Sequence, residues 1–311
     1  MKYIFGPVPS RRLGNSLGVD LIPFKTCSFD CIYCQLGKTN NKTISRKEYI
    51  PVNTIISELK KVLTSVKPID YLTISGSGEP TLNSRIGKII REIKKITALP
   101  VAVLTNSSLL SQENVREKLK KADLLIPSLD SAIQSTFEQI NRPFKGLRIE
   151  QIINGIKLFS KDFQGNMFLE IMLVKGINDS TAEIKRLAEA VREINPDKVQ
   201  LNTIVRPPAE RTAKPLTETE LNSIKDLIGE RVEIVSKQTI RQVSTIMMET
   251  ESEIIKIVCR RPTTLSDLSN SLGIKPAETA KYIDALTQKG LIEYKLHGKE
   301  IFYQAYRREI E

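Results

Sequence analysis

Short apolar segments alternate with amphipathic segments of helical length from residue 17 to residue 203. The apolar segments have the length of strands, and six occur, at residues 17–23, 70–75, 100–105, 123–130, 166–173 and 198–203. Helices are expected between them, at residues 53–66, 82–96, 111–120, 131–140, 148–160 and 181–194, with Asn53 as the cap of the first. Nearly continuous apolar strands joined by helices form a parallel sheet buried on both faces. We therefore expect an α/β fold, either an open doubly wound sheet or an incomplete barrel, with its chemistry at the carboxyl ends of the strands.

The pattern changes towards the C-terminus. A Pro-rich polar segment, residues 206–215, precedes a helix expected at 217–229 and a strand at 231–235. Three more helices and a hairpin are expected beyond them, at residues 252–260, 264–273, 275–290 and 291–305. Three helices followed by a hairpin resemble a winged helix-turn-helix domain. We therefore predict two domains, residues 1–240 and residues 241–311.

The composition limits what this chain can be. No segment approaches the roughly 18 uncharged apolar residues that span a membrane, and the N-terminal apolar run is too short for a signal peptide. Three of the four cysteines fall within eight positions, which is typical of a metal site in a reducing compartment. We therefore predict a cytoplasmic protein without a membrane partner. Almost all of the net charge of +11 lies upstream of residue 241, and it fits either a solvated lysine-rich surface or a face that binds a polyanion.

Cys27, Cys31 and Cys34 follow the first strand with C-x3-C-x2-C spacing. This spacing lets one loop wrap three thiolates around one face of an iron–sulfur cluster. The alternative is structural zinc, which nearly always takes four Cys or His ligands. The remaining candidates for a fourth ligand, Cys259 and His297, lie in the C-terminal part, where Cys259 is expected to be a small buried core residue. Three ligands leave one iron position open for a substrate or cofactor.

This motif, with Tyr33 directly before the last cysteine, resembles the signature of the radical S-adenosylmethionine (SAM) superfamily. The resemblance implies a partial (β/α)6 barrel, followed here by the small winged-helix-like domain, and one [4Fe-4S] cluster on the three cysteines. It also implies that SAM binds the fourth iron and is cleaved reductively to a 5′-deoxyadenosyl radical, which abstracts hydrogen from a substrate.

Three further segments are similar to motifs of that family. Residues 75–82, SGSGEPTL, resemble the segment that contacts the amino group of SAM, and the residues concerned are Gly76, Ser77, Gly78 and Glu79. Asn106 and Asp130 lie in the similar Thr-Asn-Ser and Ser-Leu-Asp segments after the third and fourth strands. Each segment alone would more often be a turn or a helix cap.

Polar residues also occur on later strands. Glu170, Met172, Gln200 and Asn202 share one face within each strand, which predicts either a lined cavity or satisfied polar groups in the core. Arg142 and Arg206 are candidates for binding a phosphate or a carboxylate, with structural ion pairs as the alternative.

Within the superfamily, TISGSGEPTL, INRP and VQLNTIVRPP resemble an uncharacterised branch related to the wyosine-base synthases that modify transfer RNA. Those synthases carry a second set of cysteines, which this chain lacks. The resemblance implies an electron donor such as flavodoxin or ferredoxin and a substrate that includes transfer RNA among its candidates. A glycyl-radical activating enzyme and a redox-responsive DNA-binding regulator are the alternatives, although the third C-terminal helix has few net positive charges for reading DNA.

Overall fold

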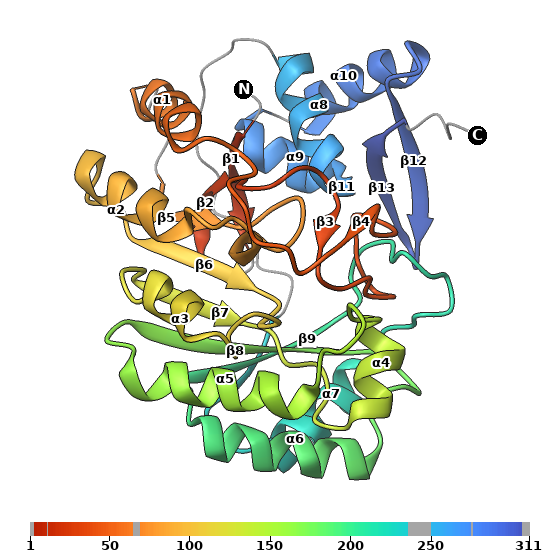
Figure 1. The fold of residues 1–311 in the computed structure, drawn as a ribbon. Coiled ribbons are helices and arrows are strands. Elements are labelled where there is room, and N and C mark those ends of the chain that lie inside the picture. The colour runs from red at the N-terminus through yellow and green to blue at the C-terminus, as the bar shows by residue number, and fades with distance from the viewer. Residues whose placement is uncertain (1–2, 11, 65–68, 236–249, 275, 307–311) are drawn as a thin grey trace.

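The computed structural model describes residues 3–10, 12–64, 69–235, 250–274 and 276–306. An eight-stranded sheet runs through its centre in the order β1-β2-β5-β6-β7-β8-β9-β10 (Figure 1). These strands are β1 (Ile4–Ser10), β2 (Gly14–Val19), β5 (Tyr71–Ile74), β6 (Val101–Thr105), β7 (Leu124–Pro127), β8 (Asn166–Leu173), β9 (Lys198–Thr203) and β10 (Val232–Ile234). All neighbours from β2 to β10 are parallel. The predicted parallel sheet is therefore confirmed.

Strand β1 was not predicted from the sequence. It contains Pro7 and Pro9, which cannot donate to a ladder and so argue against a strand. The structure accommodates them because β1 is an edge strand, antiparallel to β2, with an irregular register between Phe5 and Val8. Strand β2 also begins earlier than expected and ends at Val19, before Pro23.

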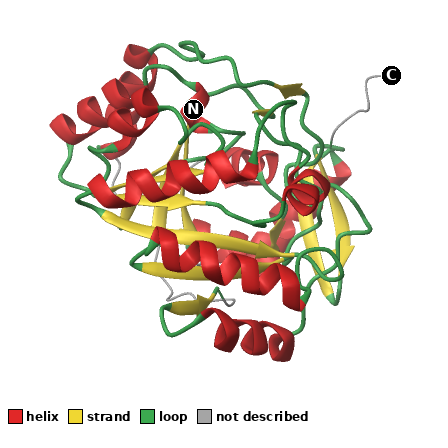
Figure 2. Ribbon diagram, turned by 60° about the horizontal axis from the view of Figure 1, so that its bottom comes forward, coloured by secondary structure: helices red, strands yellow, loops and turns green. Residues whose placement is uncertain are grey.

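Helices follow the strands of the large sheet and pack along it (Figure 2). They are α1 (Val52–Leu63), α2 (Ile86–Ile96), α3 (Glu113–Leu119), α4 (Gln134–Asn141), α5 (Ile149–Asp162), α6 (Thr181–Ile194) and α7 (Glu218–Ile228). The bounds of α6 match the prediction. The predicted cap Asn53 is wrong, because α1 begins directly after Pro51 and includes Asn53. The helix expected at 82–96 is interrupted at Asn83, whose side chain donates to Leu21 O, so a short 3₁₀ helix, η1 (Pro80–Leu82), precedes α2.

One apolar core joins the sheet to these helices. Ile55 and Leu59 of α1 and Ile89 and Ile93 of α2 are fully buried in it. Burial of such a side chain contributes about 1.5–3 kcal/mol, before the entropy of ordering it is subtracted. This core fixes the strands and thereby the positions of the loops at their carboxyl ends.

The C-terminal elements form a second, smaller unit. It holds α8 (Thr250–Arg260), α9 (Leu265–Leu272), α10 (Pro276–Gln288) and a sheet in the order β11-β13-β12, with bounds Thr263–Thr264, Glu300–Ala305 and Ile292–His297. The predicted helices and hairpin are confirmed, while the boundary expected between residues 240 and 241 lies outside the described residues. Val8 of β1 belongs to the core of this unit, so the unit rests on the edge strand of the large sheet. Cys259 is exposed on α8, and its predicted burial is therefore wrong.

No helix in the described part of the chain combines the length and the apolar character needed to cross a membrane.

Candidate active site

A cavity of about 370 Å³ lies at the carboxyl ends of the parallel strands, where the fold class places a functional site. The three clustered cysteines line it, together with residues that follow β5, β6 and β9 and the inner face of β8. The C-terminal unit also contributes to its wall, through Arg260 and Arg261. Its volume is in the range of a small-molecule site.

Each of the three cysteine sulfurs accepts a hydrogen bond from a side-chain N–H group. The donors are Lys25 Nζ for Cys34, Asn106 Nδ2 for Cys27 and Asn141 Nδ2 for Cys31, over 3.3, 3.4 and 3.4 Å respectively. Hydrogen bonds to sulfur stabilise the thiolate form and tune the reduction potential of an iron–sulfur cluster. The three donors come from three different segments, so the fold as a whole converges on these sulfurs.

The backbone around Cys27 is fixed from both sides. Lys25 has left-handed backbone dihedrals with φ of 55°, and its N–H donates to Ser77 O over 2.6 Å. Cys27 O accepts from Thr43 N over 2.9 Å, next to the short pair of strands β3 (Thr26–Cys27) and β4 (Asn41–Lys42). A non-glycine residue with positive φ is uncommon, and here it turns the chain into the cysteine loop.

The donor set fits an iron–sulfur cluster better than zinc. Among the residues that the structure describes, no three Cys, His, Asp or Glu side chains are close enough together to hold one metal ion. Structural zinc needs four such ligands around one ion, whereas the thiolates of a [4Fe-4S] cluster bind separate irons. Burial raises the pKa of Cys27 to about 12 and also raises the pKa of Cys31. Buried thiolates therefore require nearby positive charge, which cluster iron supplies.

Gly76 and Gly78 allow the end of β5 to approach the cysteine loop. A Cβ atom at Gly78 would collide with Thr26 O, and one at Gly76, whose φ is 119°, would collide with Asp20 Oδ1. Both glycines line the cavity, as expected. Ser77 does not, because its N–H and Oγ donate to the two oxygens of Asp20 over 2.7 and 3.0 Å. A direct contact of the Ser77 side chain with a ligand is therefore not supported by the geometry.

Glu79 also lines the cavity, but its carboxylate is engaged by the chain itself. It is 2% exposed, and it accepts hydrogen bonds from Thr81 N, Thr81 Oγ1, Thr105 Oγ1 and Asn106 N over 2.5–3.0 Å. Burial raises the pKa of Glu79, and these hydrogen bonds oppose that shift. Glu79 thus fixes Asn106, which in turn donates to Cys27.

Asp130 lies behind the cavity wall that Tyr33 forms. Its carboxylate accepts hydrogen bonds from Tyr33 Oη, Asn141 Nδ2 and Met172 N over 2.5, 2.6 and 2.9 Å. Burial raises the pKa of Asp130 to about 6, although these hydrogen bonds lower it. Asp130 is therefore a positioning residue for Tyr33 and, through Asn141, for Cys31. The prediction from the sequence was that Asp130 contacts the cofactor, but its carboxylate does not line the cavity.

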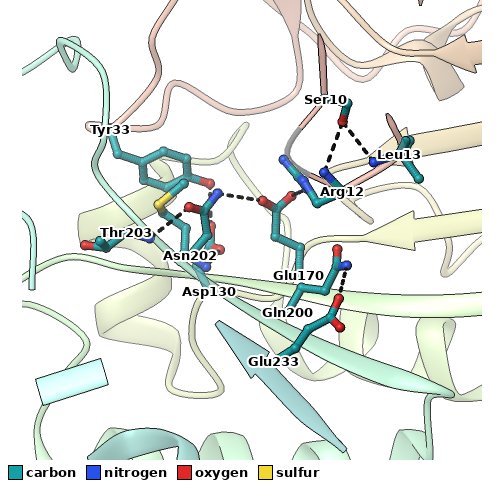
Figure 3. Close-up of polar contacts among 11 residues, drawn as sticks. Ser10, Arg12, Leu13, Tyr33, Asp130, Glu170, Gln200, Asn202, Thr203 and Glu233 are labelled. Atoms are coloured by element: carbon teal, nitrogen blue, oxygen red, sulfur yellow. Dashed lines mark hydrogen bonds and ion pairs between the residues drawn. The ribbon is translucent and has the colours of Figure 1, made fainter. Parts of the chain in front are cut away.

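Polar side chains line the other side of the cavity (Figure 3). Arg12 Nη1 lies 2.7 Å from Glu170 Oε2, and Asn202 Nδ2 donates to Glu170 Oε1 over 3.1 Å. Met172 lines the cavity with them, which agrees with the predicted lined face. Gln200 does not belong to this group, because it donates to Glu233 on β10 over 2.6 Å.

The two candidate anion-binding arginines differ in their surroundings. Arg142 forms a half-exposed ion pair with Glu210 at 2.6 Å, so the structural alternative holds for Arg142. Arg206 lines the cavity with a side chain that is only 12% exposed. Arg142 and Arg206, for which the sequence led to the same prediction, therefore differ in burial and in their ion-pair partners.

Several residues of the site were missed from the sequence. Asp20 interrupts an apolar segment, and Lys25 stands two positions before the first cysteine, so both had a local signal. Arg12 and Arg260 had none, because the fold brings them to the cavity from the N-terminal hairpin and from α8. Arg260 forms an ion pair with Asp20 and stacks on the ring of Phe5, 4.2 Å from its centroid.

A cavity at the ends of parallel strands, with three cysteines set for an iron–sulfur cluster, defines a cluster-dependent α/β enzyme. Residues 21–190 match the radical SAM superfamily. A UPF0026 protein of Helicobacter pylori J99 is 36% identical over 310 residues, which cover 98% of each chain. This chain therefore belongs to the radical SAM superfamily, whose enzymes use a [4Fe-4S] cluster and SAM and need a reductant.

Two further similarities bear on the extent of the match. A protein of Brachyspira hyodysenteriae named GTPase Obg is 40% identical over 305 residues, which cover 97% of this chain and 45% of that protein. The crystal structure of a radical SAM methyltransferase from Sphaerobacter thermophilus has a TM-score of 0.54 and 15% identity, and the match covers 70% of this chain and 65% of that one. The structural similarity supports the fold.

Proposed function

We propose that this chain binds one [4Fe-4S] cluster through Cys27, Cys31 and Cys34, and that it uses SAM to abstract a hydrogen atom from a substrate bound over β8 and β9. The observation that carries this proposal is the common cavity. The three sulfurs, each with an N–H donor, share it with a polar wall formed by Arg12 and Glu170. A site for cofactor activation is thus continuous with a site that can recognise a second molecule.

A [4Fe-4S] cluster held by Cys27, Cys31 and Cys34 would pass one electron from an external reductant to bound SAM, and this electron would break the sulfonium C–S bond. The chain's own residues hold the reactants. Gly76 and Gly78 offer bare backbone to the methionine part of SAM, and Tyr33 and Asn106 complete the wall beside it, while Glu79 keeps Asn106 in place. Ser77 and Asp130 act from behind the wall through Asp20 and Tyr33.

The sheet, in this proposal, is the partial (β/α)6 barrel of the superfamily, and the described elements of the C-terminal unit form a winged-helix-like domain. That domain closes the side of the cavity and contacts a partner protein or presents the substrate. The DNA-binding alternative receives no support from Arg260 and Arg261, since both line the cavity. The reducing conditions that three thiols need favour a cytoplasmic location and a donor such as flavodoxin or ferredoxin. The charge excess before residue 241 favours transfer RNA as the alternative to a small substrate.

Anaerobic reconstitution with iron and sulfide, followed by reduction with dithionite and SAM, tests the proposal. The intact chain should release 5′-deoxyadenosine and methionine, and Cys27→Ala, Cys31→Ala and Cys34→Ala should each abolish the release. Cys259→Ala is the matched control, because this cysteine is exposed and outside the cavity. Bound zinc without iron, or the same release from the Cys31→Ala protein, would refute the proposal.

A further inference from the structure

Arg206 is almost buried, but its hydrogen-bonding capacity is poorly used. Its Nη1 lies at the limit of hydrogen bonding to Gln35 Oε1, 3.5 Å away, and its Nη2 lies 3.8 Å from Asp267 Oδ2 of α9. Among the residues that the structure describes, no acceptor pairs with its buried Nε. A buried guanidinium with so few partners is costly unless a ligand supplies an acceptor.

Arg12 lies in the same cavity, where Glu170 is its close charged partner. Its Nη1 is close to Glu170, as described above, but no acceptor in the described part of the chain meets this buried nitrogen with hydrogen-bond geometry. The pKa of Arg206 is lowered to about 9, and burial is the largest cause. The positive charges of Arg261 and Arg12 also lower it. All three arginines line the same cavity, and Asp267 and Glu300 favour the charged form of Arg206.

The three arginines come from three parts of the chain that meet at the side of the sheet. Arg12 follows β1, Arg206 follows β9, and Arg261 follows α8 of the C-terminal unit. The C-terminal unit packs on β1 through Val8 and approaches Arg206 through Asp267. It thereby spans from the edge strand β1 to the loop after β9 and encloses the cavity from the side.

We propose that Arg12 and Arg206, with Arg261 from the C-terminal unit, bind a phosphate group of the substrate. The inference rests on the proposed function, because it assigns the substrate class of the same cavity. A phosphate offers several charged oxygens, and guanidinium groups recognise such oxygens through paired hydrogen bonds. Bound phosphate would provide an acceptor for the Arg206 Nε atom, and the C-terminal unit would be part of the substrate site.

Binding of inorganic phosphate to the reconstituted holoenzyme, measured by calorimetry with SAM present, tests the proposal. Arg206→Ala should weaken phosphate binding by about tenfold or more, and Arg206→Lys should restore it only in part because an ammonium lacks the fork. Asp267→Asn should instead strengthen binding, because it removes a competing negative charge beside Arg206. Arg142→Ala is the matched control and should leave binding unchanged, since Arg142 pairs with Glu210 outside the cavity wall.

Two further readouts separate this proposal from the proposed function. The affinity for SAM, measured without phosphate, should be the same for Arg206→Ala and the intact chain, whereas Cys31→Ala, which tests the proposed function, should lose SAM binding. Titrations with nucleoside 5′-monophosphates and with unfractionated transfer RNA compare two sources of the phosphate. The source is the ligand that binds Arg206→Ala more weakly than it binds the intact chain. Equal phosphate binding by Arg206→Ala and the intact chain would overturn the proposal. A loss of SAM affinity with unchanged phosphate binding would also overturn it, because Arg206 would then serve the carboxylate of the cofactor.

Discussion

Replacement of Asp20 by alanine tests how the fold holds the segment beside the cysteine loop. Asp20 is 3% exposed and accepts two hydrogen bonds from Ser77 as well as the ion pair from Arg260 of the C-terminal unit. A hydrogen bond to a charged group contributes about 1.5–3 kcal/mol, and loss of one partner of a buried ion pair costs about 3–5 kcal/mol. These contributions share one carboxylate and are not additive. We expect Asp20→Ala to lower the free energy of unfolding by about 3–5 kcal/mol.

Denaturant unfolding under anaerobic conditions measures this change. Asp162→Ala is the control, because Asp162 is 64% exposed and pairs with Lys120 at 3.4 Å, and it should change stability by less than about 0.5 kcal/mol. The folded fraction of Asp20→Ala should also bind SAM more weakly, because the Gly76–Gly78 backbone loses the hydrogen bonds from Ser77 to Asp20. A loss of stability no greater than that of Asp162→Ala would show that the reasoning about this buried carboxylate is wrong.

The remaining predictions concern residues around the sulfurs. Burial raises the pKa of Asp130 from 3.8 to about 6, so the folded state holds this proton more tightly than the unfolded state does. The contribution of Asp130 to the free energy of unfolding should therefore fall as pH rises from about 4 to 6. Denaturant unfolding of Asp130→Asn at a series of pH values should show a free energy of unfolding without this fall. The same pH profile for the variant and the intact chain would contradict the prediction. Gly78→Ala should lower the iron content after reconstitution, because its Cβ would displace Thr26; full iron incorporation would contradict the close packing. Asn141→Ala should shift the midpoint potential of the cluster to more negative values in a redox titration, since Cys31 loses an N–H donor, and an unchanged potential would exclude that role.

Periodicity predicted the parallel sheet and most helices because buried strands and amphipathic helices leave their pattern in every residue. It failed at β1, where two prolines conceal an edge strand, and at Asn83, where a side-chain hydrogen bond outweighs helical propensity. In the site, the cysteines and the glycines were predictable because short spacing and small size are local properties. The positioning roles of Asp20 and Arg260 depend on contacts between distant segments, so no local pattern carries them.

The spectroscopic response of the reduced cluster to SAM is the most direct test of the central claim. Electron paramagnetic resonance of the anaerobically reconstituted, reduced protein should show one [4Fe-4S]⁺ signal per chain, and the signal should change when SAM is added, because the iron without a cysteine ligand binds the cofactor. An unchanged spectrum in the presence of SAM, or a metal content of zinc in place of iron, would contradict the account.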